Sequence, residues 1–176
     1  MTSSTSKMLA FAGLAVFLAL FSTGCASCNP GQYQIDVELD ESLKEASVVV
    51  DLVGVNGSSL PRWESYSMTK YWQESDPMRR EAEQERVTIS FVSGQSLTQS
   101  VAATNAVWEK WQNRNVTHVM VLASPPGAHT DQPGIQDSRR QILPLDTCHW
   151  IKKTEALELL VKRSGIDVIT PVRPAK

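Results

Sequence analysis

The chain has 176 residues, of which 41% are hydrophobic and 20% are charged, and its formal net charge is −2. This length fits one globular domain and leaves little room for two. Because the chain is slightly acidic and has no basic block, nucleic acid is not expected among its partners.

The first 25 residues have the pattern of an export signal. A polar start with one positive charge, Lys7, precedes an apolar run from Met8 to Phe21. That run is shorter than the roughly 20 residues that a helix needs to cross a bilayer. It also lacks a polar face, so a secretion signal fits it better than a core helix does.

Small residues stand directly before a cysteine in Ser22-Thr-Gly-Cys25. This arrangement resembles the lipobox of bacterial lipoproteins, which implies cleavage before Cys25 and acylation of that residue. We therefore expect a signal peptide over 1–24, a lipidated tether over 25–32 and a single domain over 33–176. Two or more acyl chains make membrane anchoring stable, since each buried CH₂ contributes about 0.8 kcal/mol.

The residue after the cysteine is Ala26 and not Asp. In the enteric lipoprotein pattern this implies sorting to the outer membrane, facing the periplasm. Ordinary cleavage and free secretion is the alternative.

Two further cysteines, Cys28 and Cys148, remain if Cys25 carries lipid. The periplasm permits disulfides, and a bridge between these two would close a loop of about 120 residues and stabilise the fold by about 5 kcal/mol in the chain-entropy model. The sequence leaves a bridge and two free thiols both open. Cys25-Ala-Ser-Cys28 has the CxxC spacing of a zinc site, but Cys25 is expected to carry lipid, so we expect neither a metal nor a cofactor.

The N-terminal half of the expected domain predicts two strands and a helical segment. Alternation over 33–39 predicts a half-buried strand, and the β-branched run 46–55 predicts a strand covered on both faces and ended by a turn at 56–59. Residues 60–73 favour a short helix with Pro61 in its first turn. Asp76-Pro77 then predicts a cap and a helical start, and the charged stretch 79–86 is expected to be solvated.

The middle of the chain alternates again over 87–92 and breaks at 93–95. The three- and four-residue spacing of apolar residues that follows predicts a helix from Leu97 to about Gln112. Residues 116–123 form the clearest strand, which is followed by a proline-containing turn and a polar loop over 128–138.

Residues 140–145 predict another strand, with Pro144 implying an edge or a strand end. Residues 154–163 fit either a helix, by propensity, or the first strand of a hairpin turning at Ser164-Gly165. The β-rich context favours the hairpin. Together these elements predict a mainly β fold, a small β-sandwich with two or so short helices.

Catalytic signatures are missing from the sequence. It contains no HExxH, GxSxG or GxxxxGK[ST] motif. His118 lies inside a predicted strand, and His149 adjoins Cys148, so that strand geometry would point the two side chains to opposite faces. We therefore expect a protein that is not an enzyme, with a hydrolase as a remote alternative.

Aromatic residues are the remaining candidates for a contact surface, because Trp and Tyr are common anchors of protein interfaces. We expect the aromatic helix, with at least one exposed Trp, and the proline-rich loop to contact a protein partner. The residues concerned are Trp63, Tyr66, Tyr71, Trp72, Pro125, Pro126 and His129. The alternative is a lipoprotein that binds a small ligand or cell-wall fragment in a cleft lined by Trp108, Trp111 and His129.

The order of these features resembles the TssJ family, the outer-membrane lipoprotein of the type VI secretion membrane complex. The resemblance is carried by the lipobox at Cys25, the strand pair 33–39 and 47–55, the aromatic segment 63–72, the strand 87–92 with Ser93-Gly-Gln95, and the strand 116–123. It implies a small lipid-anchored β-sandwich with added helices. It also implies a structural role, in which loops of the sandwich tether the periplasmic domain of an inner-membrane partner to the outer membrane.

Overall fold

The computed structural model describes residues 28–151 and 154–174. The expected signal peptide over 1–24 and Cys25 lie outside the described residues.

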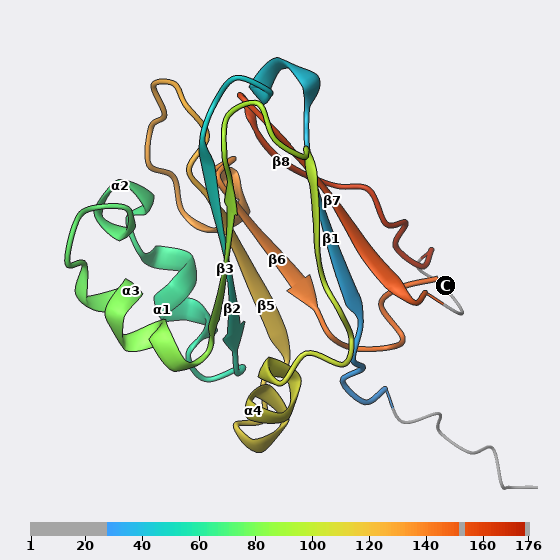
Figure 1. Ribbon diagram of the computed structural model, residues 1–176. Helices are drawn as coiled ribbons and strands as arrows, with labels where there is room; N and C mark the ends of the chain where they lie inside the picture. The colour runs from blue at the N-terminus through green and yellow to red at the C-terminus, as the bar shows by residue number, and fades with distance from the viewer. Residues whose placement is uncertain (1–27, 152–153, 175–176) are drawn as a thin grey trace, which may run out of the picture.

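Two four-stranded sheets make up the described part of the chain (Figure 1). The first sheet has the order β4-β1-β7-β8 and the second has the order β3-β2-β5-β6. Neighbouring strands are antiparallel, except that β1 and β7 run parallel. The strands are β1 (Gln34–Leu39), β2 (Val48–Val55), β3 (Arg86–Phe91), β4 (Thr98–Val101), β5 (His118–Ala123), β6 (Arg140–Pro144), β7 (Ala156–Lys162) and β8 (Gly165–Val168). The predicted β-sandwich is confirmed.

Short helices fill the connections between the strands. The α-helices are α1 (Leu60–Ser65), α2 (Met68–Tyr71), α3 (Pro77–Glu81) and α4 (Val107–Asn113), and the 3₁₀ turns are η1 (Glu41–Leu43), η2 (Ala82–Gln84) and η3 (Gly134–Gln136). Helices α1 to α3 lie on the outer side of the β2 sheet, and α4 lies at one end of the sandwich (Figure 1).

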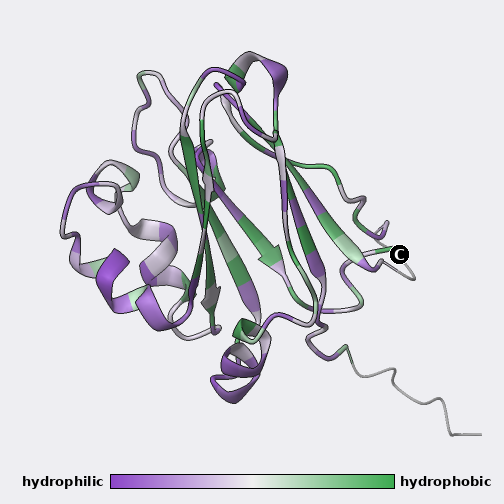
Figure 2. Cartoon of the chain, in the orientation of Figure 1, coloured by the Kyte–Doolittle hydropathy of each residue, from purple (hydrophilic) through white to green (hydrophobic). Residues whose placement is uncertain are grey.

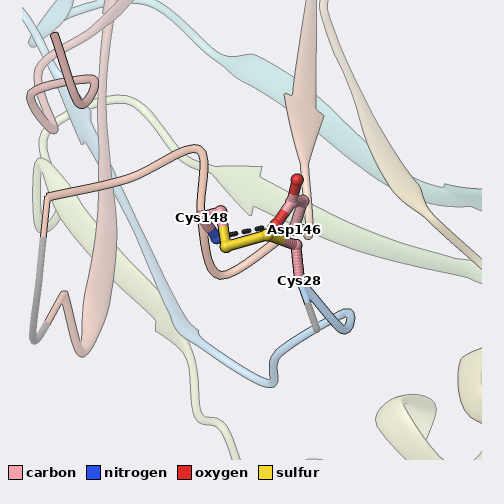
Figure 3. Close-up of side chains that lie close together, drawn as sticks. All are labelled: Cys28, Asp146 and Cys148. Atoms are coloured by element: carbon pink, nitrogen blue, oxygen red, sulfur yellow. Dashed lines mark hydrogen bonds between the residues drawn. A yellow bond between two sulfur atoms is a disulfide. The ribbon is translucent and has the colours of Figure 1, made fainter. Parts of the chain in front are cut away.

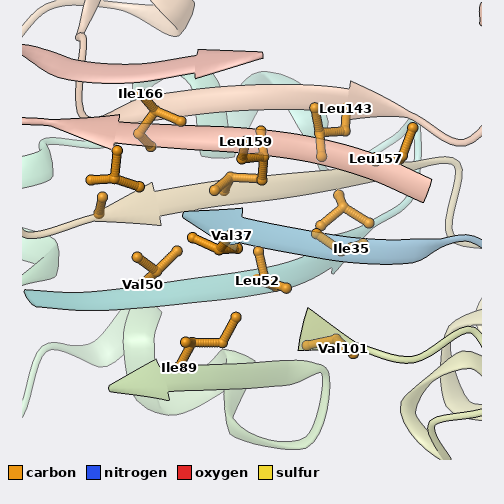
Figure 4. Close-up of a cluster of buried hydrophobic side chains, with 14 of the residues drawn as sticks. Ile35, Val37, Val50, Leu52, Ile89, Val101, Leu143, Leu157, Leu159 and Ile166 are labelled. Atoms are coloured by element: carbon orange, nitrogen blue, oxygen red, sulfur yellow. The ribbon is translucent and has the colours of Figure 1, made fainter. Parts of the chain in front are cut away.

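The main core lies between the two sheets, where the apolar side chains of the strands meet (Figure 4). Hydrophobic and hydrophilic residues both occur along the strands that enclose it (Figure 2). Ile35 and Val37 of β1 are fully buried, as are Val50 and Leu52 of β2 on the facing sheet. Burial of each such side chain contributes about 1.5–3 kcal/mol. The alternation of apolar and polar residues that predicted β1 therefore arises because one face of the strand lies in this core.

The outer face of β2 and β5 carries a second apolar cluster. Val53 and Val55 of β2, with Met120 and Leu122 of β5, pack against the helical insert formed by residues 60–84. Both faces of β2 are thus covered, which explains why its sequence is nearly continuous in β-branched residues. The prediction of a strand buried on both sides is confirmed.

The expected helix over 97–112 is wrong in its first half. Thr98–Val101 is strand β4, which pairs with β1 so that Val101 lies opposite Ile35. The free edge of β1 supplies backbone partners to this segment, and tertiary pairing of that kind overrides local periodicity. The helix begins only at Val107, whose N–H donates to the side chain of Asn105 (2.9 Å).

Two other expectations need smaller corrections. The helix expected over 60–73 is broken at Tyr66, which has extended backbone (φ −74°, ψ 140°), and α2 restarts after Ser67, whose hydroxyl accepts from Lys70 N. The predicted C-terminal hairpin is confirmed, but Lys162 pairs with Gly165, so the turn is one residue earlier than expected.

Gly54 of β2 lies directly against the Trp111 ring of α4. A Cβ on Gly54 would lie 2.3 Å from Cδ1 of Trp111. The Trp111 ring is 1% exposed, and its Nε1–H donates to the Glu85 carbonyl (2.9 Å), so it has little freedom to move away. A glycine is required here for space.

We expect Gly54→Ala to lower the free energy of unfolding by about 1–3 kcal/mol, since overpacking forces neighbouring groups from their positions. Urea unfolding followed by tryptophan fluorescence measures the change. Gly57→Ala is the matched control, because the nearest atom to its added Cβ is Thr117 Oγ1 at 4.0 Å. Equal stability of the two variants would contradict this account.

Candidate functional site

Asp51 joins the helical insert to the sheet. Its side chain is fully buried on the outer face of β2. Its carboxylate accepts hydrogen bonds from the Tyr71 hydroxyl (2.8 Å), Arg79 Nε (2.8 Å) and the Thr88 hydroxyl (2.6 Å). Arg86 Nε lies 3.7 Å from the same carboxylate. A buried carboxylate is tolerated only with such partners, so Asp51 fixes where α2 and α3 lie.

Tyr71 and Arg79 are held in a fixed arrangement around this carboxylate. Burial raises the pKa of Tyr71, and the charge of Asp51 and the hydrogen bond to it raise it further, so the phenol stays a donor. The Arg79 guanidinium carbon lies 4.8 Å from the centre of the Trp72 ring, within the range of a cation–π contact. The charged stretch 79–86 is therefore not wholly solvated, because Arg79 and Arg86 both turn inward.

Asp131 attaches the long loop after β5 to the insert. Its carboxylate accepts from the Ser67 hydroxyl, from the Thr69 N–H (3.0 Å) and hydroxyl (2.7 Å), and from Arg139 Nη2 (2.6 Å). Partial burial alone would raise the pKa of Asp131, but these hydrogen bonds outweigh it and hold the pKa below its usual value. Arg139 also pairs with the buried Asp137 (2.8 Å).

Arg140 makes the second link between the loop and the insert. Its guanidinium donates to four backbone carbonyls, two in the insert and two in the loop: Trp63 (2.6 Å), Tyr66 (3.0 Å), Gln132 (2.8 Å) and Gly134 (2.9 Å). The residue is 1% exposed, and burial lowers its pKa from the ordinary value. An arginine nevertheless remains charged in proteins, so its donors must stay satisfied and the two segments stay joined.

The insert (60–84) and the loop (124–139) therefore form one continuous surface, which we call the composite surface. A shallow hollow of about 610 Å³ lies at their junction. Pro61 of α1 and Pro133 of the loop are among its lining residues, and Ile135 beside them is 62% exposed. An exposed isoleucine next to two prolines is an apolar contact point on an otherwise polar loop.

Several residues predicted to contact a partner are located inside the protein. Trp63 is 9% exposed and Tyr71 1% exposed, and both pack in the outer cluster. Pro125 is also buried. The expectation that these three side chains offer a surface is corrected: Trp63 and Tyr71 cover the apolar outer face of β2 and β5, and Pro125 is buried at the start of the loop.

The other predicted contact residues keep part of their surface. Tyr66, Trp72, Pro126 and His129 are half-buried, and all four belong to the composite surface. Sequence reasoning missed Ile135, although a single isoleucine in a polar loop was a usable signal.

The alternative cleft of Trp108, Trp111 and His129 is wrong. Trp108 and Trp111 are 2% and 1% exposed, and their indole N–H groups donate to the carbonyls of Ala102 (3.2 Å) and Glu85 (2.9 Å). Their helix α4 lies at the end where β5 begins, whereas His129 lies in the loop after β5 ends (Figure 1). The three side chains do not line one cleft.

The structure joins Cys28 and Cys148 in a disulfide (Figure 3). The Asp146 carboxylate accepts from the Cys148 N–H (2.6 Å). Among the described residues, Cys28, Asp146 and Cys148 are the one group with three potential metal ligands in reach of one another. Because both sulfur atoms are bonded to each other, only the carboxylate remains as a ligand, which does not suit a metal site.

Backbone hydrogen bonds hold the residues after Cys28 to the same end of the sandwich. Gly31 N–H donates to the Leu145 carbonyl (2.7 Å), and Thr147 N–H donates to the Asn29 carbonyl (3.2 Å). Pro30 forms a bridge with Asp146. The described part of the expected tether is thus attached to the folded body.

No helix within 28–151 or 154–174 has the length and apolarity to cross a membrane.

Comparison with known proteins finds no matching family model and no matching curated sequence. Similar solved structures include Lip of Serratia marcescens, a membrane-bound component of the type VI secretion system (12% identity, 82% of this chain and 99% of that chain, TM-score 0.49). They also include the C-terminal domain of the type VI secretion protein TssM from EAEC (11%, 78% and 99%, TM-score 0.50) and the lipoprotein TssJ1 of Pseudomonas aeruginosa (11%, 84% and 99%, TM-score 0.44).

One of these structures, the TssM domain, reaches a TM-score of 0.50, and its likeness to this chain confirms the predicted resemblance to type VI secretion proteins at the level of the fold. The match to the TssM domain carries the fold argument, and at 11% identity it shows the fold alone.

Replacement of Asp51 should release the insert. We expect Asp51→Asn to lower the free energy of unfolding by about 3 kcal/mol, because it breaks a buried ion pair and leaves donors without an acceptor. Urea unfolding measures the loss. Asp167→Asn is the control: Asp167 pairs with Lys162 but is 53% exposed, and surface pairs contribute about 0–1 kcal/mol. A loss for Asp51→Asn no larger than for Asp167→Asn would refute the role assigned to Asp51.

Peptide mapping of the non-reduced protein should recover Cys28 and Cys148 in one linked peptide pair. Because the bridge spans a sequence separation of 120 residues, its reduction should lower the free energy of unfolding by about 4–5 kcal/mol in the chain-entropy model. Reductant should not change the free energy of unfolding of the double variant Cys28→Ser, Cys148→Ser. Alkylation of both thiols in the native, unreduced protein would rule the bridge out.

Proposed function

We propose that this chain is a lipid-anchored, non-enzymatic scaffold protein of the cell envelope, and a component of a type VI-like secretion complex. Acylated Cys25 anchors it in the outer membrane, with the domain facing the periplasm. Its task is to hold a protein partner, the periplasmic domain of an inner-membrane component, beside that membrane.

The observation that carries the proposal is the lipobox at Ser22–Cys25, which comes directly before the bridged Cys28. A lipobox implies export and acylation, and a disulfide is typical of the oxidising compartments that exported proteins reach. Cys25 of the lipobox and the bridged Cys28 lie three residues apart, and both features indicate an exported protein. The sandwich fold shared with the TssM domain supports a place in the same kind of complex.

The composite surface is the proposed site of partner contact. It is joined by the Asp51, Asp131 and Arg140 networks, so its shape is fixed before a partner arrives. Preorganisation of that kind reduces the entropy cost of binding. Ile135 and the half-buried Trp72 are its proposed anchors, since aromatic and apolar side chains contribute most of the binding energy at interfaces.

Metabolic labelling tests the lipid anchor. Labelled palmitate should enter the wild-type protein and be absent from Cys25→Ser, because the acyl chains require that sulfur. Cys28→Ser is a matched control that keeps the lipobox and should label normally. Equal labelling of the wild type and Cys25→Ser would end the lipoprotein proposal.

Site-specific photocrosslinking in intact cells tests the partner surface. A crosslinking amino acid at Ile135 or Trp72 should trap one protein, identified by mass spectrometry as an envelope component. The control position is Val92, which is 51% exposed and lies outside the composite surface. The surface is wrongly assigned if Val92 traps the same protein equally well, or if Ile135 and Trp72 trap none.

A further inference from the structure

Both ends of the described chain emerge at the same end of the sandwich (Figure 1). Strands β1 and β7 begin there and β6 ends there, close to the Cys28–Cys148 bridge. We call this the anchor end. We infer that the exposed side chains of Ile151 and Val172 at the anchor end insert into the lipid interface, so that the sandwich stands on the membrane in one orientation. The inference rests on the proposed acylation of Cys25.

The reach of the chain between Cys25 and Cys28 brings the anchor end to the membrane. Three residue steps span at most about 11 Å, even fully extended. The polar region of each leaflet is roughly 5–8 Å thick. The disulfide and the pairing of Asn29 with Thr147 fix the chain from Cys28 onward. The anchor end must therefore lie within about 11 Å of an acylated Cys25, close to the lipid headgroups.

Ile151 and Val172 both lie in the segments that follow this bridge and run to the C-terminal end of the described chain. The Arg173 N–H donates to the His149 carbonyl (2.8 Å), and Trp150 and Val172 form a bridge pair. Ile151 is only three residues after Cys148 and is 42% exposed, while Val172 is 52% exposed. Two exposed apolar side chains at the same end of the sandwich offer surface whose burial in lipid is favourable.

Clustering along the chain distinguishes these side chains from scattered apolar residues. Of the five large apolar side chains that are exposed in the described residues, three fall at the anchor end: Ile151, Ile169 and Val172. Ile169 lies at the margin, because it also lines a hollow with Asp36 and Glu158, which lipid phosphates would repel. The contact is therefore assigned to Ile151 and Val172.

The charge that follows Val172 along the chain favours an anionic lipid surface as the occupant. Arg173 is exposed directly after Val172, and a basic residue at the interface is attracted to anionic headgroups. Asp146 is half-buried and accepts a hydrogen bond from the Cys148 backbone, so it is engaged within the fold. The exposed acids at this end are Glu155, whose carbonyl accepts from the Gln34 N–H, Glu158 of β7 and Glu109 of α4.

This orientation has a consequence for the partner surface. The loop of the composite surface starts at Ser124, whose N–H donates to the Val49 carbonyl near the beginning of β2. That is the far end of the sandwich from the bridge (Figure 1). A sandwich standing on its anchor end presents the start of this loop away from the membrane, toward a partner that comes from across the periplasm.

Depth-dependent fluorescence quenching tests the orientation. The full acylated protein is reconstituted into vesicles of phosphatidylethanolamine and phosphatidylglycerol that contain a spin-labelled lipid. A fluorophore is attached through Ile151→Cys or Val172→Cys. With Cys25 acylated and Cys28 bonded to Cys148, the introduced thiol is the one that reacts. Val92→Cys is the matched control, since Val92 is as exposed (51%) as Val172 (52%) but directly follows the end of β3, at the opposite end of the sandwich.

Quenching at Ile151 and Val172 several-fold stronger than at Val92 is the expected result. Equally weak quenching at all three positions, in protein that floats with the vesicles, overturns the orientation and leaves the lipid anchor intact. If the purified protein carries no acyl chain and does not float, the proposed function fails and this inference fails with it.

Discussion

The cross-link between Cys28 and Cys148 determines which end of the sandwich lies beside the expected lipid anchor. It joins residues 120 positions apart in the sequence, and in the chain-entropy model such a loop closure stabilises a fold by about 5 kcal/mol. Its larger consequence is geometric. Once the start of the folded chain is fixed at one end of two stiff sheets, the strand directions determine which loops lie at that end and which lie at the opposite end.

A second constraint comes from the β2–β5 sheet, which is apolar on both faces. One face packs on the other sheet, and the second needs a cover, which the insert supplies. The buried polar groups contribute little to the stability of the packed insert, because a buried ion pair gains little net stability over apolar packing. Asp51 and Arg140 instead fix the position of the cover and join it to the loop, so two segments far apart in sequence become one surface.

Local patterns in the sequence predicted most of the fold. Alternation gave β1 and β3, and the continuous apolar run gave β2 as a strand covered on both faces. The prediction failed where a distant partner decides the structure: β4 is a strand because β1 offers it an edge, and the parallel pairing of β1 with β7 joins segments more than a hundred residues apart. The prediction that the aromatic residues Trp63 and Tyr71 contact a partner failed for a related reason. Asp51 within an apolar strand and two arginines in a charged run were the visible signs that Trp63 and Tyr71 cover a buried network, but only their pairing in space reveals it.

The most direct measurement of the central claim is the intact mass of the protein extracted from membranes with a mild detergent, without reductant. The account predicts a chain that begins at an acylated Cys25 and lacks the two hydrogens removed by the Cys28–Cys148 bond. A mass that corresponds to the full sequence from Met1, with free thiols and no acyl chain, would contradict it.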